Sequence, residues 1–367
     1  MKPLSRVLVG GLVSSCVSLI FVSSLSAERA TADSVLTNSN TLVVTAQREE
    51  TAVDSVGSSI TVITQEEIKR KHQPTVLELL RSVPGVSVIQ NGGPGGTSSV
   101  FIRGAESDHT LVLIDGIRVN DSNSGQFSFA DMKTENIERI EVLRGPQSVL
   151  YGSEAIGGVI NVITKHAAEG VEAGVTLGGG SYSTQDYAAY ARYGKEGFQS
   201  SNSIAFYDTN GFSVAQKKNG NYEKDGYSNL NFSSGNRFDF AQDGNLDLNF
   251  GYTNADKDLD DFDFALGAID NLNATQDREL FTTSVSIAKS VNEWLTPTLE
   301  LGFNHDQIEG KDPVVVFNNF DIVNQNSTAT GELDIQASSE TLATLGYSYE
   351  HRSGESKGNF DESRNVN

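Results

Sequence analysis

The 367-residue sequence has one cysteine, one tryptophan and only 7 prolines. The cysteine, Cys16, lies in an apolar N-terminal run that is too short to span a membrane as a helix. A chain that loses this run on export can form no disulfide and offers no thiol for catalysis or metal binding. Basic residues are also scarce, since 27 Lys and Arg oppose 48 Asp and Glu and give a net charge of -21. A nucleic-acid-binding protein needs a basic surface, so this class is excluded.

Residues 1–27 are predicted to be a cleaved secretory signal peptide. Two basic residues precede the apolar run Val7 to Phe21, and small residues follow it. A lipoprotein cleavage site at Cys16 is the alternative interpretation. The polar residues 28–40 that come next predict a flexible tether.

Residues 48–167 predict a compact α+β domain. Thr64 to Glu67 fits a capping box that opens a short helix, and Pro74 suits the first turn of a second helix. The Asp115-Gly116 pair marks a tight hairpin. Four β-branched or apolar runs bounded by turn residues predict strands. These runs are Val100 to Arg103, Thr110 to Ile114, Ile137 to Leu143 and Val159 to Thr164.

From residue 168 to 367 apolar and polar residues alternate with a period of two, in segments of about ten residues. A soluble sandwich or a membrane barrel with a polar lumen would both produce this alternation. Aromatic residues near segment ends and long polar connections at one end favour the barrel. We count about nine strands between Gly170 and Arg352 on this pattern. The predicted fold class is therefore an α+β plug domain followed by part of an antiparallel transmembrane β-barrel.

Four motifs, in order from Thr41 to Lys165, resemble the successive signatures of the TonB-dependent outer-membrane receptors. They are TLVVTAQR, LLRSVPGVSV, FIRGAESDHTLVLIDGIRVND and IERIEVLRGPQSVLYGSEAIGGVINVITK. Within that family, TLVVTA followed by QNGGPGGTSSVFIRG is most similar to the cobalamin (vitamin B12) receptors. The resemblance implies a plug inside a barrel of about 22 strands. We therefore expect the sequence to be a C-terminally truncated fragment.

The resemblance also implies a function. It is active transport of a scarce large ligand, cobalamin first, across the outer membrane of a Gram-negative cell, by a monomer that binds outer-membrane lipid. The periplasmic partner TonB would supply the energy, and no cofactor is required. A ferric-siderophore or haem receptor is the alternative within the family, so the ligand would be cobalamin or a metal chelate. A passive porin-like channel or a surface adhesin is the alternative from another class. No G-x-S-x-G or H-E-x-x-H motif occurs, so we predict that the protein is not an enzyme.

Residues 41–47 are the predicted TonB box. A single short strand on a polar tether buries little by itself, but it suits addition to the sheet edge of another protein. A strand tucked against the plug at rest is the alternative. The predicted TonB-binding residues are Thr41, Leu42, Val43, Val44, Thr45 and Ala46.

Two loop-like segments are predicted to bind the ligand. Gln90 to Phe101 is rich in glycine but lacks the spacing of a phosphate loop. By resemblance this segment and Asn120 to Phe129 face the outer vestibule, where exposed amides would suit a large polar ligand. Ordinary flexible loops are the alternative. The predicted ligand-binding residues are Asn91, Gly92, Gly93, Ser98, Asn120 and Asp121.

An acidic segment, DKDLDDFD at residues 256–263, predicts calcium binding in the outer loops. Dense carboxylates favour a hard cation, and the resemblance places calcium between neighbouring outer loops of cobalamin receptors. A solvated acidic loop or a surface that faces lipopolysaccharide is the alternative. The predicted metal ligands are Glu223, Asp225, Asp256, Asp258, Asp261 and Asp263.

Three charged residues of the plug motifs, Arg103, Glu141 and Arg144, are predicted to form charge-assisted contacts inside the plug or to the barrel wall. Charges in a filled lumen are tolerated only when they are paired. Such pairs would act as a latch that energy input must break, or as permanent structural pairs.

Overall fold

The computed structural model describes residues 42–43, 51–52, 57–213, 224–240, 243–263, 267–269, 271, 273–313, 315, 318–338, 341–358 and 362–366. The predicted signal peptide and tether lie outside the described residues. Of the predicted TonB box, only Leu42 and Val43 are described. They form strand β1 (Leu42–Val43), which pairs antiparallel with β2 (Thr51–Ala52). In the described part of the chain, no helix is both long and apolar enough to cross a membrane.

The plug is built on a five-stranded mixed sheet with the strand order β3-β8-β9-β6-β7. Strand β6 runs parallel to β9, and the other neighbours are antiparallel. These strands are β3 (Ser59–Ile63), β6 (Thr110–Ile114), β7 (Ile117–Arg118), β8 (Ile137–Arg144) and β9 (Gly158–Thr164). A separate antiparallel hairpin joins β4 (Val86–Gln90) to β5 (Ser98–Ile102). The four strands expected in this domain are confirmed.

Short helices cover the plug sheet, and local sequence signals fix their ends. They are α2 (Gln65–Lys71), α3 (Val76–Leu80), α4 (Ser148–Tyr151) and the 3-10 turn η3 (Ser107–His109). Thr64 caps α2, since its hydroxyl accepts a hydrogen bond from Glu67 N at 3.3 Å. The predicted hairpin between β6 and β7 is also confirmed, because Asp115 and Gly116 both have positive φ, 48° and 80°.

Apolar side chains fill the interior of the plug. Phe129, Leu77, Leu80 and Ile140 are each at most 1% exposed, and they belong to one continuous cluster. Burial of this kind supplies most of the free energy that holds a small domain together. The plug therefore has an apolar core, which Leu280 of the large sheet joins.

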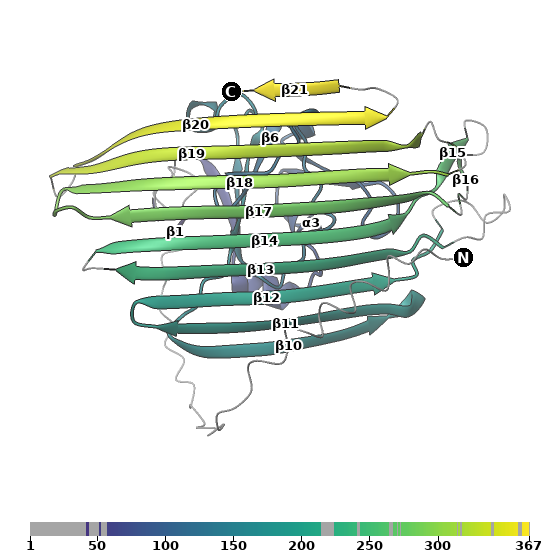
Figure 1. The fold of residues 1–367 in the computed structure, drawn as a ribbon, viewed down its shortest axis with the longest axis horizontal. Coiled ribbons are helices and arrows are strands. Elements are labelled where there is room, and N and C mark those ends of the chain that lie inside the picture. The colour runs from purple at the N-terminus through teal and green to yellow at the C-terminus, as the bar shows by residue number, and fades with distance from the viewer. Residues whose placement is uncertain are drawn as a thin grey trace, which may run out of the picture. The chain divides into compact units, whose positions relative to one another are not determined.

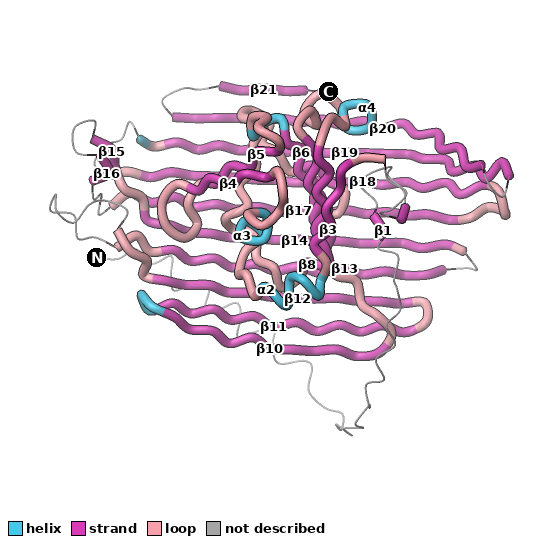
Figure 2. Tube along the Cα trace, turned by 180° about the vertical axis from the view of Figure 1, so that it is seen from behind, coloured by secondary structure: helices cyan, strands magenta, loops and turns pink. Residues whose placement is uncertain are grey.

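Ten strands form a second, wholly antiparallel sheet in which each strand pairs with its neighbours in chain order. Figure 1 views this sheet from its outer face, and Figure 2 shows the plug lying across the opposite face. Its strands are β10 (Gly170–Gly180), β11 (Thr184–Lys195), β12 (Phe198–Thr209), β13 (Tyr227–Phe240), β14 (Gly244–Asp258), β17 (Thr275–Lys289), β18 (Leu295–Lys311), β19 (Phe320–Ser338), β20 (Thr341–Gly358) and β21 (Glu362–Val366). A small hairpin of β15 (Asp261–Asp263) and β16 (Gly267–Ile269) interrupts the β14–β17 connection, and the 3-10 turn η4 (Ser181–Ser183) joins β10 to β11.

Nine of these strands, β10 to β20, are those counted from the alternation. The predicted length is wrong, because the strands run from 11 residues in β10 to 19 residues in β19. Short turns join the strands at one end of the sheet, the left end in Figure 1, and longer connections join most of them at the other, where only β10 and β11 are joined by a short turn in the described residues. The extra length carries several strands beyond the span of about ten residues that a bilayer requires.

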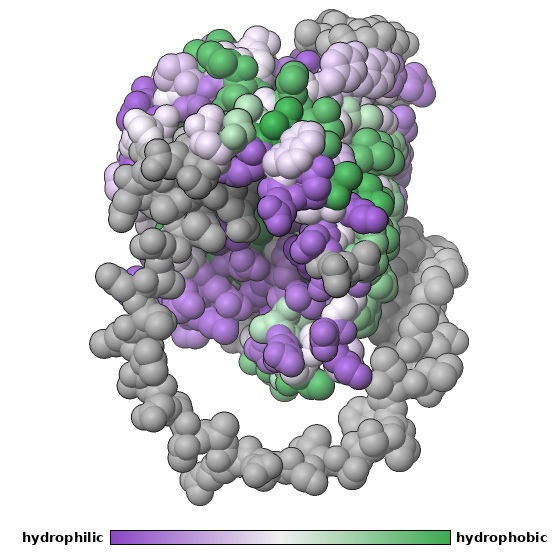
Figure 3. Space-filling model, turned by 90° about the vertical axis from the view of Figure 1, so that its left-hand side faces the viewer, coloured by the Kyte–Doolittle hydropathy of each residue, from purple (hydrophilic) through white to green (hydrophobic). Residues whose placement is uncertain are grey.

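The two faces of the large sheet differ in chemistry. Leu299, Leu301 and Tyr347 are 46%, 45% and 76% exposed on the outer face. Figure 3 looks at the short-turn end and shows hydrophobic residues gathered along the side where the sheet lies. At this end Tyr193, Phe198 and Phe238 form an aromatic row, with ring centroids 6.2 Å and 4.9 Å apart. The alternation thus separates an apolar outer face from a polar face that meets the plug.

Candidate functional site at the seam between plug and sheet

The plug and the inner face of the large sheet meet along a boundary that we call the seam. The strongest contact across it is a buried group of charged side chains centred on Arg278 of β17, which we call the Arg278 joint. Its guanidinium donates two hydrogen bonds to the carboxylate of Asp306 on β18, at 2.9 Å and 2.7 Å. A third hydrogen bond, 3.0 Å long, reaches Asp131 of the plug. The Tyr227 hydroxyl of β13 donates to the same plug carboxylate at 2.9 Å. Arg278 is only 4% exposed, so plug and sheet share an ion network that solvent barely reaches.

Beside this joint lies a pocket of about 320 Å³, which we call the aromatic pocket. It opens between the β4–β5 loop and α3 of the plug and the long-connection ends of β12 and β13. The rings of Tyr207 and Tyr227 lie 5.8 Å apart. Its lining includes Pro74, Leu77, Glu78, Gln90, Gly92, Gly93, Pro94, Gly95, Tyr207, Phe212 and Tyr227.

Glycine at position 95 is a geometric requirement of the aromatic pocket. Gly95 has a φ of 72°, and a Cβ atom there would lie 2.1 Å from the Tyr227 ring. The loop is folded on itself, because Asn91 N donates to Thr97 O at 2.9 Å and Gly96 N donates to Gly93 O at 3.0 Å. The plug backbone therefore approaches the aromatic wall closely and in one conformation.

The structure divides the six predicted ligand-binding residues into two groups. Gly92 and Gly93 line the aromatic pocket, and Asn91 is exposed on the same loop. Asp121 follows the plug hairpin, where its carboxylate accepts a hydrogen bond from Asn324 of β19 at 3.0 Å. Asp121 therefore links plug to sheet, and ligand contact by these four residues stays a prediction.

Ser98 and Asn120 lie in the plug interior and not in the vestibule where we expected them. The Ser98 hydroxyl accepts a hydrogen bond from Phe129 N at 3.0 Å. The Asn120 amide accepts from Val112 N at 2.7 Å and donates to Thr110 O and Gly125 O at 2.9 Å and 2.8 Å. At 2% and 3% exposure, both side chains satisfy buried backbone groups.

The predicted calcium ligands are not brought together in the described part of the chain. The carboxylate of Asp258 accepts a hydrogen bond from Gly226 N at 2.9 Å, and Asp225 is 7% exposed. Asp256 lies on β14 opposite Asp277 of β17. Glu223 and the side chains of Asp261 and Asp263 lie outside what the structure describes. Among the described residues, no group of three or more acidic, histidine or cysteine side chains could hold a metal ion. Calcium binding stays a prediction.

The three predicted latch residues form contacts inside the plug. Arg144 donates to Pro84 O at 2.6 Å and to Thr61 Oγ1 at 2.9 Å. The carboxylate of Glu141, 0% exposed, accepts from Arg139 Nε at 2.8 Å. Arg103 is exposed, and its backbone N–H donates to Gly85 O at 2.8 Å. Their role as a latch remains a prediction.

Other residues supply the ion pairs between plug and sheet, and sequence reasoning missed them. Arg118 of β7 lies 3.1 Å from Glu350 of β20, and Glu154 of the plug pairs with Arg352 of the same strand. Arg118 also pairs with Glu154, which closes the group into a network. The sequence did contain a signal for these pairs. Glu350 and Arg352 occupy neighbouring inward positions of β20, whereas the inward positions of the other strands are mostly Ser, Thr or Asn.

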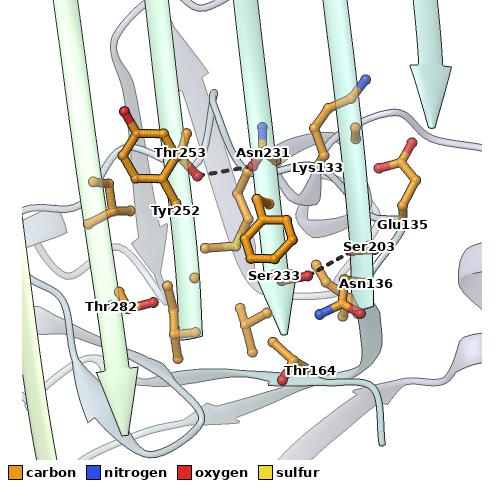
Figure 4. A pocket seen from close by; sticks show the side chains of 18 residues that line it. Lys133, Glu135, Asn136, Thr164, Ser203, Asn231, Ser233, Tyr252, Thr253 and Thr282 are labelled. Carbon is orange, nitrogen blue, oxygen red and sulfur yellow. Dashed lines mark hydrogen bonds between the residues drawn. The ribbon is translucent and has the colours of Figure 1, made fainter. Parts of the chain in front are cut away.

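A second cavity, of about 90 Å³, also lies between plug and sheet, and we call it the polar pocket. Figure 4 shows short polar side chains from both walls pointing into it. On the sheet, Ser203 and Ser233 share a hydrogen bond of 2.7 Å, and Thr253 donates to Asn231 at 3.0 Å. The polar residues of its lining are Lys133, Glu135, Asn136 and Thr164 of the plug and Ser203, Asn231, Ser233, Tyr252, Thr253 and Thr282 of the sheet. The rest of the lining is apolar and makes up most of the exposed surface of the cavity, with Ile114, Met132, Ile137 and Val162 of the plug and Ala205, Phe232 and Leu280 of the sheet.

A family model and several solved structures both match this chain. Residues 52–159 match the family model of the TonB-dependent Receptor Plug Domain. The ferripyoverdine receptor of the outer membrane of Pseudomonas aeruginosa superimposes with a TM-score of 0.69 at 16% identity, over 88% of this chain and 47% of that receptor.

Two further solved structures agree. The ferric-catecholate import receptor Fiu of E. coli K12 gives a TM-score of 0.67 at 16% identity, over 83% of this chain and 48% of Fiu. The siderophore receptor PiuA of Acinetobacter baumannii gives 0.64 at 18% identity, over 82% of this chain and 46% of PiuA. This chain thus spans about half the length of the receptors that it matches. Residues 52–159 are thus similar to the TonB-dependent receptor plug domain, and the sheet after them has the same fold as part of these solved structures.

Proposed function

We propose that the full-length gene product is an outer-membrane receptor that binds a ferric siderophore and imports it with energy delivered by TonB. The observation that carries this proposal is the aromatic pocket, which a TonB-dependent plug and a partial barrel build together. A receptor that must release its ligand by moving the plug needs a binding site with walls on both parts. No catalytic role is proposed for any residue.

The chemistry of the aromatic pocket suits a siderophore. Tyr207, Phe212 and Tyr227 offer flat apolar surfaces, while the loop from Gly92 to Gly95 offers backbone amides and carbonyls. Pockets for small ligands combine mainly apolar walls with a few placed polar groups, usually in about 300–1,000 Å³. A metal chelate with planar rings and many hydrogen-bonding oxygens fits that combination.

The comparisons favour a siderophore over cobalamin, the first expectation from the sequence. The three receptors named above are receptors for siderophores or ferric catecholates, and they share this chain's fold. A passive porin-like channel fits less well, because the plug fills the seam with the Arg278 joint and the Arg118 network. Cobalamin and haem remain outcomes of the binding test.

The ligand is tested by equilibrium binding to the purified full-length gene product in detergent. The probes are a ferric catecholate, a ferric hydroxamate, cobalamin and haem, each with and without calcium. We expect one ferric siderophore to bind well above the others. Cobalamin binding alone would overturn the siderophore assignment, and no binding of any probe would overturn the uptake function.

Coupling to TonB is tested at the short strand β1. Val43 pairs with Thr51 of β2 in the structure, so exchange of this pairing for one with TonB requires the backbone hydrogen bonds of residues 42–43. Proline at Val43 removes an N–H donor. We expect Val43→Pro to reduce energised uptake to background and to leave ligand binding unchanged. Normal uptake by this variant would contradict the proposed role of TonB.

A further inference from the structure

Lys133 lies at the boundary between the two pockets of the seam. Among the described residues, its side chain is the one that lines both the aromatic pocket and the polar pocket. It comes from the plug and is only 5% exposed. A buried lysine is costly unless it is paired, so its position calls for a partner on the sheet.

The sheet provides a two-sided site for the Lys133 ammonium. Its nitrogen lies 3.0 Å from Asp186 Oδ1 on β11 and 4.6 Å from the centre of the Tyr207 ring on β12. Asp186 and Tyr207 are directly opposite each other in the β11–β12 register. The carboxylate and the ring face together hold the cation, so that the lysine side chain crosses the seam from plug to sheet.

A second carboxylate stands on the polar-pocket side. Glu135 lies two residues after Lys133, and Figure 4 shows both side chains at the same end of the polar pocket. The Glu135 Oε2 atom is buried and accepts no hydrogen bond from any residue that the structure describes. Burial raises the pKa of Glu135, while the positive charge of Lys133 acts in the opposite direction. Lys133 therefore forms an ion pair with Asp186, and a second carboxylate nearby, that of Glu135, has one oxygen that could accept a hydrogen bond from it.

We propose that Lys133 is the gate between the aromatic pocket and the polar pocket, which are successive stations on the ligand's path along the seam. In the closed state the Lys133–Asp186 pair separates them. In the open state the ammonium leaves Asp186 for Glu135, and the ligand passes along the Ser- and Asn-lined wall of β12 and β13. The proposal that a ligand moves between the two pockets rests on the uptake function proposed above. The proposal that Lys133 closes the boundary between them does not.

The closed gate also excludes small solutes. The polar pocket, of about 90 Å³, is far too small for a chelate while the seam is closed. Its lining is mainly apolar, but serine, threonine and asparagine side chains on both walls offer hydrogen-bond partners, so water and small sugars would enter if the seam opened at Lys133. Loss of the lysine should therefore produce a passive leak even when no ligand is transported.

The test uses the full-length gene product in liposomes and measures vesicle swelling in arabinose. Lys133→Ala removes the side chain that crosses the seam, and Asp186→Asn weakens its anchor without changing size. We expect Lys133→Ala to raise the swelling rate about tenfold, the change in an opening equilibrium from loss of one charged hydrogen bond. Asp186→Asn should give a smaller rise. Arg352→Met is the matched control, because it breaks another plug–sheet ion pair that lines neither pocket.

Three results would overturn the gate. One is unchanged swelling in both variants with a melting temperature equal to that of the unmodified receptor. Another is an equal leak from Arg352→Met, which would report a general loosening of the plug. The third concerns the case in which Lys133→Ala does not fold. The Asp186→Asn variant is then decisive, and the absence of a leak from it would overturn the gate. Failure of the uptake function appears separately, as absence of ferric-siderophore binding to the unmodified receptor, whatever the swelling rates.

Discussion

The plug and the large sheet place their apolar side chains in opposite positions. In the plug, Phe129 and Leu80 are 0% exposed. In the sheet, Leu301 is 45% exposed on the outer face, while Asn229 and Asn304 are 2% exposed where the sheet meets the plug. The plug is organised like a water-soluble domain, and the sheet is organised for an apolar exterior and a polar lumen.

The opposite placement of apolar side chains bears on how the plug and the sheet are held together. Their shared seam combines apolar contacts, such as Leu280 of β17 packed into the plug core, with the directional ion pairs of Arg278, Lys133 and Arg118. Directional contacts can be broken one at a time, whereas an apolar core melts cooperatively. We therefore expect the ion pairs of the seam to open before the plug core does.

The sharpest test of the comparison removes one large apolar side chain from each part. Phe129→Ala should destabilise the plug by about 3–5 kcal/mol, because it leaves a cavity in a closed core. Leu301→Ala on the outer face should cost about 1 kcal/mol or less, because no cavity forms there. Hydrogen exchange of the β6 and β9 amides measures plug opening in both variants. Equal effects would mean that the two parts are not organised oppositely.

The next largest effect is expected at the charged joint. Arg278→Met leaves the carboxylates of Asp131 and Asp306 buried without their cation, and we expect a loss of about 3 kcal/mol in the stability of the docked plug. Adding Asp131→Asn and Asp306→Asn should restore much of it, since the uncompensated charges are then gone. The melting temperature of the full-length protein is the measurement. A triple variant as unstable as Arg278→Met alone would exclude charge as the cause.

A small effect is expected where the plug passes into the first sheet strand. His166 Nδ1 lies 3.9 Å from Glu138 Oε2, and the Glu138 carboxylate raises the pKa of this histidine above its ordinary value of 6.5. The protonated imidazole therefore stabilises the plug below about pH 6.5, and this contribution is lost as the pH rises through the folded-state pKa. Both groups are about one third exposed, so a few tenths of a kcal/mol are expected.

The measurement for His166 is a comparison of His166→Gln with the unmodified protein in thermal unfolding. We expect a lower melting temperature for the variant at about pH 5.5 and no difference at about pH 8.5, where the imidazole is neutral in both states. Glu138→Gln should give the same pH dependence. A destabilisation that is equal at both pH values would show that His166 acts through packing alone.

Local patterns made the fold predictable. The Thr64 cap, the Asp115-Gly116 hairpin and the alternation in β10 to β20 are each encoded within a few residues, so the order of the elements followed from the sequence. Strand length did not follow, because the strands continue with the same alternation to as many as 19 residues, well past the ten or so that were predicted. The period-two pattern carries no signal for where a strand ends.

The seam was not predictable for a different reason. Arg278 and Asp131 are 147 positions apart, and only the folded sheet brings them within 3.0 Å of each other. Asn120 was expected at the surface because a polar residue in a loop-like segment gives the same local signal whether it faces ligand or buried backbone. Gly92 and Gly93 of the β4–β5 loop line the aromatic pocket, and their contact with ligand stays a prediction.

The central claim is that the aromatic pocket binds the ligand, and two phenylalanines test it most directly. Phe212 lines the pocket and is 44% exposed, while Phe250 lies on the outer face of the sheet and is 37% exposed. Equilibrium binding of the ferric siderophore to the full-length protein should weaken by about tenfold in Phe212→Ala, the value of one lost aromatic contact. Phe250→Ala should bind as the unmodified protein does. Unchanged affinity in Phe212→Ala, or an equal loss in both variants, would contradict the account.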